Sequence, residues 1–570
     1  MKEEPMRFAA LSLVVALLMT GCAREETPDT TDAADAAKDS DRAATVLRPT
    51  FSEERLHDHI RILASDEFEG RAPSTPGEEK TLAYLVKQFG EIGLEPGNGD
   101  SYLQPVPLVS IQADTDMVLE IKGDGTDIKL AGRDDMTAWT KRVTDATSIE
   151  DSEVVFVGYG VVAPEYGWND YEGLDVEGHT VIILVNDPGY ATQNPELFTG
   201  NEMTYYGRWT YKYAEAARQG AAGAFIVHET APASYPWGVV AANYGRPRFD
   251  LVTEDKNFSR VPVEGWITHE AAQEVFSAAG LHYETEKEKA ASADFKPVPL
   301  GLTASIAVQN TLKESVSQNV VGVLRGSERP DETIVFTAHW DHLGKNDELD
   351  GDTIYNGAVD NASGTAALIE LARAFAELPE RPKRSIVFLA VTAEEQGLLG
   401  SRHYANNPTE SLPKMVATLN MDSANVYGET NDVQVIGWNF SELQDYVDEA
   451  AAIQDRITVQ EPTPEAGYYY RSDHFNFAKV GVPSLYAEGG DDLKNGGKEA
   501  GRAAAKDYRA NRYHKPADEY DESWDLSGMT QDMELDFLIA NKLANEDTFP
   551  NWRETSEFRA IRDASRANMQ

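Results

Sequence analysis

Side chains that can bind metal ions or move protons follow several apolar, strand-like runs of this chain. His339 and Asp341 come directly after the run 333–338, and Glu394–Glu395 follows the run 385–391. Further along the chain stand Asp360 in "GAVDNASG", Asp422 in "LNMDS", and Tyr513 and His514 in "YHKPADEYD". Because ligand sites of α/β proteins form at the carboxyl ends of strands, we expect these side chains to meet at one edge of a sheet.

The adjacent pair Glu394–Glu395 places two like charges where an apolar strand ends. A cluster of unpaired carboxylates is costly, whereas divalent cations turn the same carboxylates into a set of ligands. Carboxylate and imidazole groups without sulfur suit zinc, and manganese or cobalt is compatible with the same ligands. Two such ions about 3.5–4 Å apart need a bridging group, which one carboxylate can supply through its two oxygens. The pattern therefore predicts two zinc ions per chain.

The elements that must position these residues alternate between strands and helices. Apolar runs of strand length also occur at 415–421 and 482–487, and 365–378 carries apolar residues at helical spacing. This rhythm predicts an α/β fold whose mixed, mostly parallel sheet is covered by helices on both faces. The part 114–297 differs, because short β-rich pieces alternate there with clusters of Gly, Pro and Asn. We interpret it as a small β-rich domain inserted into the main one.

The first part of the chain has the features of a targeting segment. Within residues 1–22, the apolar run 11–19 is too short to span a bilayer, and Thr-Gly-Cys22 follows it. This pattern resembles a bacterial lipoprotein signal, in which the cysteine is lipidated. The segment 23–47, rich in Ala, Asp and Thr, indicates a disordered acidic tether. We therefore expect a lipid-anchored protein of the bacterial cell envelope that faces the periplasm or the exterior.

Charge and cysteine content exclude several classes of partner and site. The chain has 96 Asp and Glu residues against 51 Lys and Arg residues, which leaves a formal net charge of -45. Such a surface repels nucleic acid and anionic lipid headgroups, so we expect membrane contact only through the N-terminal lipid. Cys22 is the only cysteine, so the chain can have neither an internal disulfide nor a thiolate metal site in its folded part.

Five sequence motifs carry the candidate residues, in the order "HWDHLG", "GAVDNASG", "AEEQGLLGS", "LNMDS" and "YHKPADEYD". Together they resemble the motifs of the cocatalytic zinc peptidases of the aminopeptidase and glutamate-carboxypeptidase family. "LASDEFEGRAP" and "YLQPVPL" near the start are similar to the bacterial branch of that family. The resemblance implies a zinc-exopeptidase domain formed by 48–113 and 298–545. It also implies an inserted protease-associated domain over 114–297, and leaves 546–570 as a polar C-terminal tail.

The same resemblance implies which residues hold the two zinc ions. His339 and Asp422 would bind one ion, and Glu395 and His514 would bind the other. Asp360 would bridge the two ions with its carboxylate. The peptide bond after Asp360 is expected to be cis in this family.

The resemblance also implies the residues that act on the substrate. Glu394 would be the general base that takes a proton from water and delivers it to the leaving amine. Tyr513 is a candidate hydroxyl donor to the oxyanion, with a packing role as the alternative. Asp341 would accept the second N–H of His339, and His342 is expected to pack or hydrogen-bond near the site.

The implied function is that of a zinc-dependent exopeptidase, and specifically an aminopeptidase acting on peptides. A carboxypeptidase or dipeptidase with the same machinery is the alternative within the fold. A receptor-like binding protein without catalysis is the alternative from another class, which the complete set of ligands and Glu394 disfavours. Arg471, Asp473 and His474 in "RSDHFNF" are candidates for substrate binding. A surface ion pair for Arg471, and a structural role for the other two residues, remain the competing interpretations.

Overall fold

The computed structural model describes residues 47–123 and 125–567, and from Pro49 onward these belong to one compact unit. Cys22 and the segments 1–22 and 23–46 lie outside the described residues, so the predicted lipid anchor stays a prediction. Within the described part of the chain, no helix is both long enough and apolar enough to cross a membrane.

The first sheet is mixed and carries the candidate residues at the ends of its central strands. These strands are parallel neighbours in the spatial order β17 (Arg384–Val391), β14 (Arg329–His339), β18 (Met415–Asn420) and β21 (Ser484–Gly489). The flanking strands are β13 (Val298–Leu324) and β19 (Asp432–Ile436), then β2 (Leu103–Ala113), β11 (Arg248–Leu251), β1 (Glu95–Pro96) and β20 (Ile457–Gln460). The four runs predicted as central strands are confirmed.

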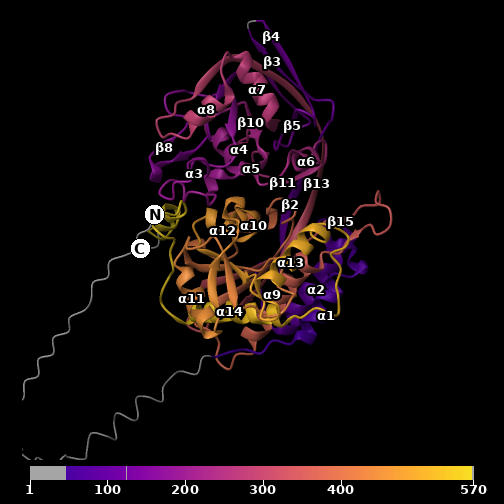
Figure 1. The fold of residues 1–570 in the computed structure, drawn as a ribbon. Coiled ribbons are helices and arrows are strands. Elements are labelled where there is room, and N and C mark those ends of the chain that lie inside the picture. Colours follow the sequence, from indigo (N-terminus) through magenta and orange to yellow (C-terminus); the bar gives the residue numbers. More distant parts are fainter. Residues whose placement is uncertain (1–46, 124, 568–570) are drawn as a thin grey trace, which may run out of the picture. The chain divides into compact units, whose positions relative to one another are not determined.

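Helices cover both faces of this sheet, as the alternation of side chains along β17 shows. Phe388 packs in the larger core, whereas Val387 and Leu389 pack in a separate core on the opposite face. The larger core holds α1 (Glu53–Leu63), α2 (Pro76–Ile92), α9 (Gly364–Ala376), α11 (Leu443–Ile453) and α14 (Ser527–Asn545). The opposite face is covered by α10 (Leu399–Asn406) and α12 (His474–Lys479) (Figure 1). The predicted α/β fold is therefore confirmed.

A second sheet is formed mainly by the part predicted as an insert. Its strands, in spatial order, are β4 (Thr126–Ala131), β3 (Val118–Gly123), β13, β6 (Ala146–Phe156), β9 (Thr180–Leu184), β10 (Gly223–His228), β12 (Val263–Thr268) and β5 (Met136–Trp139). Its main helices are α4 (Trp209–Arg218), α7 (His269–Ala278) and α8 (Tyr283–Ala290). Since β6, β9, β10 and β12 are parallel, this part has α/β character. That it is a protease-associated domain stays a prediction.

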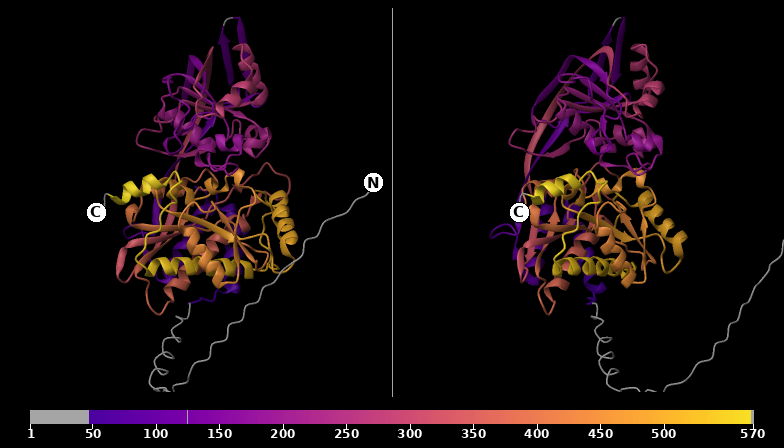
Figure 2. Two further views of the ribbon diagram at one scale, coloured as in Figure 1. Left: turned by 60° about the vertical axis from the view of Figure 1, so that its left-hand side comes forward. Right: turned by 90° about the vertical axis from the view of Figure 1, so that its left-hand side faces the viewer.

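The 27-residue strand β13 belongs to both sheets. Up to Gln309 it pairs with β6 and β3 of the second sheet, and from Asn310 it pairs with β2 and then β17 of the first. Figures 1 and 2 show this strand running from one sheet into the other. The predicted boundary between 297 and 298 thus falls at the start of a strand that the two sheets share.

Candidate metal centre

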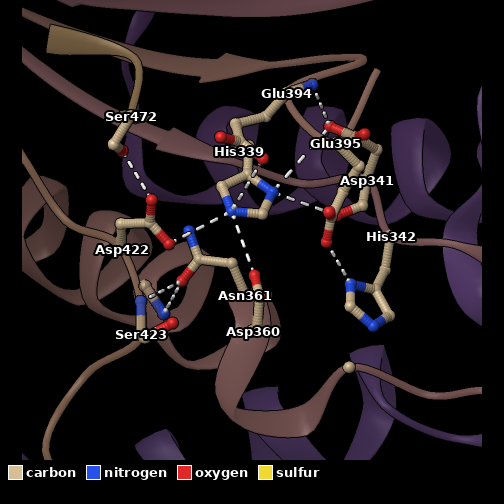
Figure 3. Close-up of polar contacts among 12 residues, drawn as sticks. His339, Asp341, His342, Asp360, Asn361, Glu394, Glu395, Asp422, Ser423 and Ser472 are labelled. Atoms are coloured by element: carbon tan, nitrogen blue, oxygen red, sulfur yellow. Dashed lines mark hydrogen bonds and ion pairs between the residues drawn. The ribbon is translucent and has the colours of Figure 1, made fainter. Parts of the chain in front are cut away.

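The first group of candidate ligands lies where β14 and β18 end. His339 is the last residue of β14, and Asp422 lies two residues beyond the end of β18. His339 Nε2 is 3.3 Å from Asp422 Oδ1 and 3.3 Å from Asp360 Oδ1 (Figure 3). The ligand atoms of these three residues all lie within 4.8 Å of one another. Ser472 donates a 2.5 Å hydrogen bond to the other oxygen of Asp422 and so fixes the orientation of that carboxylate.

Asp360 also faces a second group of candidate ligands. Its other oxygen, Oδ2, is 3.2 Å from His514 Nε2, which in turn is 3.1 Å from Glu395 Oε2. His342 Nδ1 lies 2.6 Å from Glu395 Oε1, and His342, Asp360 and Glu395 form a second set within 4.8 Å. The structure therefore brings all five predicted ligands together, with one oxygen of Asp360 facing each group.

The donor set at this centre fits divalent metal ions. The side chains of Asp360, Glu395 and His342 are at most 5% exposed, and His342 Nε2 has no hydrogen-bond partner among the described residues. Burial raises the pKa of Glu394 well above its ordinary value, and the neighbouring Glu395 and Asp422 add to the rise, although His339 opposes it. So many buried carboxylates are stabilised by dications, and carboxylate and imidazole ligands without sulfur suit zinc.

Asp360 is held in place by a turn between β14 and α9. Gly357 has a φ of +54°, and a β-carbon there would collide with the main-chain oxygen of Asp360. The peptide bond between Asp360 and Asn361 is cis, which confirms the expectation from the sequence. The Asn361 side-chain oxygen accepts the N–H of Ser423 at 3.0 Å, so Asn361 joins this turn to the loop that carries Asp422.

A residue that the sequence analysis did not single out, Asp518, supports the same turn. Its carboxylate accepts the main-chain N–H groups of Val359 and Asp360, each at 3.1 Å. Asp518 lies four residues after His514 within the motif "YHKPADEYD", so it joins the loop of His514 to the turn of Asp360. Its place in that motif was the only signal in the sequence.

The predicted contact between the Asp341 carboxylate and His339 is replaced by a different one. His339 Nδ1 lies 3.1 Å from the main-chain oxygen of Asp341, but 3.9 Å from its carboxylate. The carboxylate instead accepts the N–H of Glu394 at 3.1 Å. Asp341 therefore fixes the backbone beside Glu394, at the point where β17 ends, and positions His339 through its carbonyl group.

The loop motif "EFEGRAP" supplies a buried cation, Arg71, that stabilises the same region. Arg71 is 1% exposed, and burial lowers its pKa to about 10. Its guanidinium group donates to four main-chain oxygens at 2.6–2.9 Å, namely those of Leu63, Trp340, Asn356 and Gly357. Arg71 therefore ties α1 to the two chain segments that lead into the metal centre.

We expect the substitution Arg71→Met to lower the free energy of unfolding by about 3 kcal/mol, because it leaves several buried main-chain acceptors without donors. Urea denaturation followed by circular dichroism measures the change. The matched control is Arg61→Met, since Arg61 is exposed and pairs with Asp58 on its own helix. That control should change the stability by less than about 0.5 kcal/mol. Equal stabilities of the two variants would contradict the role of Arg71.

The metal centre opens into a cavity of about 460 Å³. Glu394, Asp360, Asp422 and His514 all line it. Tyr513 also lines it, and its ring is 44% exposed and stacks on His514 with 3.9 Å between the ring centroids. Glu394 thus reaches the cavity beside the candidate ligands, where a general base must stand.

The three predicted substrate-binding residues separate into two kinds. Arg471 lines the cavity and donates a 2.5 Å hydrogen bond to the main-chain oxygen of Ala466. Asp473 and His474 are fully buried and do not line it. Burial raises the pKa of Asp473 to about 7 and lowers that of His474 to about 3. Their position favours the structural interpretation, because α12 directs both side chains into the protein interior.

The fold and the site together define an α/β protein with a candidate binuclear metal centre at the carboxyl ends of its strands. Residues 319–538 of the chain match the family model of Peptidase family M28. The match covers less than half of the chain and includes all the candidate metal ligands.

Curated relatives match a shorter segment of the chain. The aminopeptidase NAALADL1 of Mus musculus is 34% identical over 129 residues, which are 22% of this chain and 16% of that protein. A probable zinc metalloprotease of Pyrenophora teres f. teres (strain 0-1) is 42% identical over 104 residues, which are 18% of this chain and 22% of that protein. The chain thus spans less than a quarter of the length of these relatives.

Solved structures resemble the chain over most of its length at low identity. An aminopeptidase from Aneurinibacillus sp. strain AM-1 has 20% identity and a TM-score of 0.47, covering 88% of this chain and 95% of that one. A zinc aminopeptidase from Bacillus subtilis has 18% identity and a TM-score of 0.41, covering 90% of this chain and 100% of that one.

Proposed function

We propose that the chain is a zinc-dependent exopeptidase, and specifically an aminopeptidase that removes N-terminal residues from peptides. The position of Asp360 carries this proposal, since its two oxygens lie 3.3 Å and 3.2 Å from His339 and His514. One carboxylate shared by two ligand groups is what a pair of adjacent metal ions requires. The relatives reported above include an aminopeptidase and a zinc metalloprotease, which supports the same reaction class.

We propose that His339, Asp422, Asp360, Glu395 and His514 would hold two zinc ions at this centre. When bound, zinc supplies a Lewis acid that polarises a peptide carbonyl and lowers the pKa of water. His342 lies 2.6 Å from Glu395 and orients that carboxylate, as partners of ligand carboxylates commonly do.

Glu394 is assigned as the general base. Its Oε2 lies 4.0 Å from His339 Nε2, and its main chain is fixed by Asp341. During hydrolysis the attacking water must lose a proton and the leaving amine must gain one. Glu394 takes the first proton and delivers it to the amine, so its carboxylate returns to the starting state. Tyr513 is assigned as the hydroxyl donor to the oxyanion, and its place in the cavity beside His514 supports this role.

A carboxypeptidase or dipeptidase is the second candidate function, and two arginines in the same cavity support it. Arg471 and Arg509 both line it, and their guanidinium carbons lie 5.0 Å and 5.7 Å from the ring centroid of Tyr468. Guanidinium groups bind carboxylates well, so these residues offer a place for a C-terminal carboxylate or an acidic side chain of the substrate.

We expect hydrolysis of aminoacyl-nitroanilides to stop when a chelator removes divalent metal, and to return when zinc is added. A set of free, N-blocked and C-amidated dipeptides then separates the two exopeptidase types. An aminopeptidase cleaves the free and C-amidated peptides, whereas a carboxypeptidase cleaves the free and N-blocked ones. Activity that survives chelation would contradict a metal-dependent mechanism, and no hydrolysis by zinc-loaded protein would favour the receptor-like alternative.

We further propose that Cys22 carries a lipid that anchors the protein in the cell envelope. The support is the sequence alone, since an apolar run at 11–19 precedes Thr-Gly-Cys22 and an acidic segment follows it. Expression in a bacterial host with labelled palmitate tests this proposal. The wild type should incorporate label and sediment with membranes, whereas the variant Cys22→Ser should do neither.

A further inference from the structure

Glu488 is an acidic residue of the cavity that the metal centre does not use. It lies on β21, opposite Gln434 of the neighbouring strand β19. On the other side of β21, Tyr486 pairs with Asn420 of β18. Asp422 lies two residues beyond the end of β18, both Asp422 and Glu488 line the cavity, and they are close enough for the charge of Asp422 to act on Glu488.

The carboxylate oxygens of Glu488 accept few strong hydrogen bonds from the protein. Its two oxygens lie 3.4 Å from Gln434 Nε2 and 3.4 Å from the Tyr486 hydroxyl, which are long distances for hydrogen bonds. The Tyr486 hydroxyl has one proton and donates it at 2.7 Å to the main-chain oxygen of Asp422. Glu488 is therefore left with a single weak donor and with lone pairs that face the cavity.

The charged groups around Glu488 are mainly acidic, and Arg509 of the same cavity is the positive charge that opposes them. Burial raises its pKa to about 8, and the nearby carboxylates of Asp532 and Asp422 contribute to the rise. Among the described residues, no Lys or Arg side chain forms an ion pair with it. Asp491, another acidic residue of the cavity, differs in this respect because it pairs with Arg502 at 3.1 Å. Glu488 thus feels the charge of Arg509 but has no direct ion-pair partner among the described residues.

We propose that Glu488 binds the free α-ammonium group of the substrate and so determines its specificity for peptide N-termini. This inference rests on the proposed peptidase function and deepens it. In an N-terminal residue one carbon atom separates the ammonium group from the scissile carbonyl. A peptide whose carbonyl reaches the metal centre therefore brings its amine close to Asp422, and hence to the neighbouring Glu488. An ammonium group there supplies the missing hydrogen bonds and a direct ion pair.

Two non-hydrolysable inhibitors that differ only at the amine test this proposal. L-Leucinol carries the ammonium group, and 4-methylpentane-1,2-diol has a hydroxyl in its place. We expect the zinc-loaded wild type to bind leucinol at least about tenfold more tightly than the diol, measured as inhibition constants against leucyl-nitroanilide hydrolysis. In the variant Glu488→Gln this preference should fall to about twofold or less. The ratio is taken within one protein preparation, so a partly unfolded variant does not distort it.

Two further variants sharpen the comparison. Glu488→Asp keeps the charge at a shorter reach and should retain part of the preference for leucinol. Glu429→Gln makes the same charge change at the surface, where Glu429 pairs with Lys494 at 3.1 Å, and should retain all of it. A preference that is unchanged in Glu488→Gln would overturn the inference while leaving the proposed function intact.

The same variants also distinguish two other outcomes, namely binding of a substrate side chain by Glu488 and absence of hydrolysis. If Glu488→Gln selectively loses activity toward lysyl relative to norleucyl substrates, with an unchanged preference for leucinol, Glu488 binds a substrate side chain and the inference is wrong. If the zinc-loaded protein hydrolyses nothing, the proposed function fails. Binding of leucinol and of the diol is then compared by the rise in melting temperature that each causes. Greater stabilisation by leucinol than by the diol, lost in Glu488→Gln, would still support the inference.

Discussion

Replacing Glu394 by Gln is expected to lower kcat by about 10²–10⁴-fold while leaving the zinc content unchanged. The amide keeps the size and hydrogen-bonding reach of the carboxylate but cannot accept a proton from water. The side chain of Glu394 lines the cavity and lies outside both ligand groups that share Asp360, so its loss should not weaken metal binding. Steady-state kinetics on a leucyl-nitroanilide and elemental analysis of the dialysed protein measure the two quantities.

The neighbouring residue provides the matched control for this prediction. Glu395→Gln makes the same chemical change one position along the chain, at a carboxylate that lies 3.1 Å from His514. This variant should lose zinc from one of the two sites, and part of its activity should return when zinc is added in excess. If Glu394→Gln lost zinc and Glu395→Gln kept it, the assigned roles would have to be exchanged. An active Glu394→Gln variant would exclude Glu394 as the base.

Replacing Asp360 by Asn is expected to remove both zinc ions, because each ligand group depends on one of its oxygens. Affinity for each ion should fall by more than about 100-fold, since even partners outside the ligand set cost about 10–100-fold when removed. The measurement is zinc content per chain after dialysis against a defined free zinc concentration, together with hydrolytic activity.

Asp422→Asn is the control for the Asp360 variant. Asp422 belongs to one ligand group only, so this variant should keep one zinc ion per chain where Asp360→Asn keeps none. Circular dichroism spectra of the two variants should match that of the wild type, which separates loss of ligands from loss of fold. Two zinc ions retained by Asp360→Asn would show that this carboxylate does not bridge, and the binuclear assignment would fail.

The strand ends that carry candidate residues could be predicted from the local pattern, whereas the choice of the five ligands was implied by the resemblance to the zinc peptidases. Runs such as 333–338 and 385–391 are too apolar to be anything but buried strands, so the polar residues that follow them mark strand ends. Parallel neighbours bring those ends together, which is why His339 and Glu394 lie 4.0 Å apart although more than fifty positions separate them. The meeting of these strand ends follows from the sheet topology, and the central place of Asp360 was implied by the resemblance.

The burial and partners of several other residues depend on tertiary packing, which cannot be predicted from the local sequence pattern. The sequence could not show that α12 directs Asp473 and His474 into the interior, because both are ordinary polar residues beside a cavity-lining arginine. Arg71 and Glu488 are likewise single charged residues, and their roles come from burial and from partners distant in the chain. The contact between His339 and the carbonyl of Asp341, in place of its carboxylate, is decided by a difference of less than 1 Å.

The strand β13 has a consequence for any attempt to dissect the molecule. Since Val298–Leu324 continues from one sheet into the other, excising 114–297 would strip the neighbours from its leading half. The unpaired main-chain amides and carbonyls left there would form an exposed strand edge, which can pair with other chains and cause aggregation. A shortened recombinant version would therefore need its strand trimmed back to about Asn310, where pairing with β2 begins, to stay monodisperse.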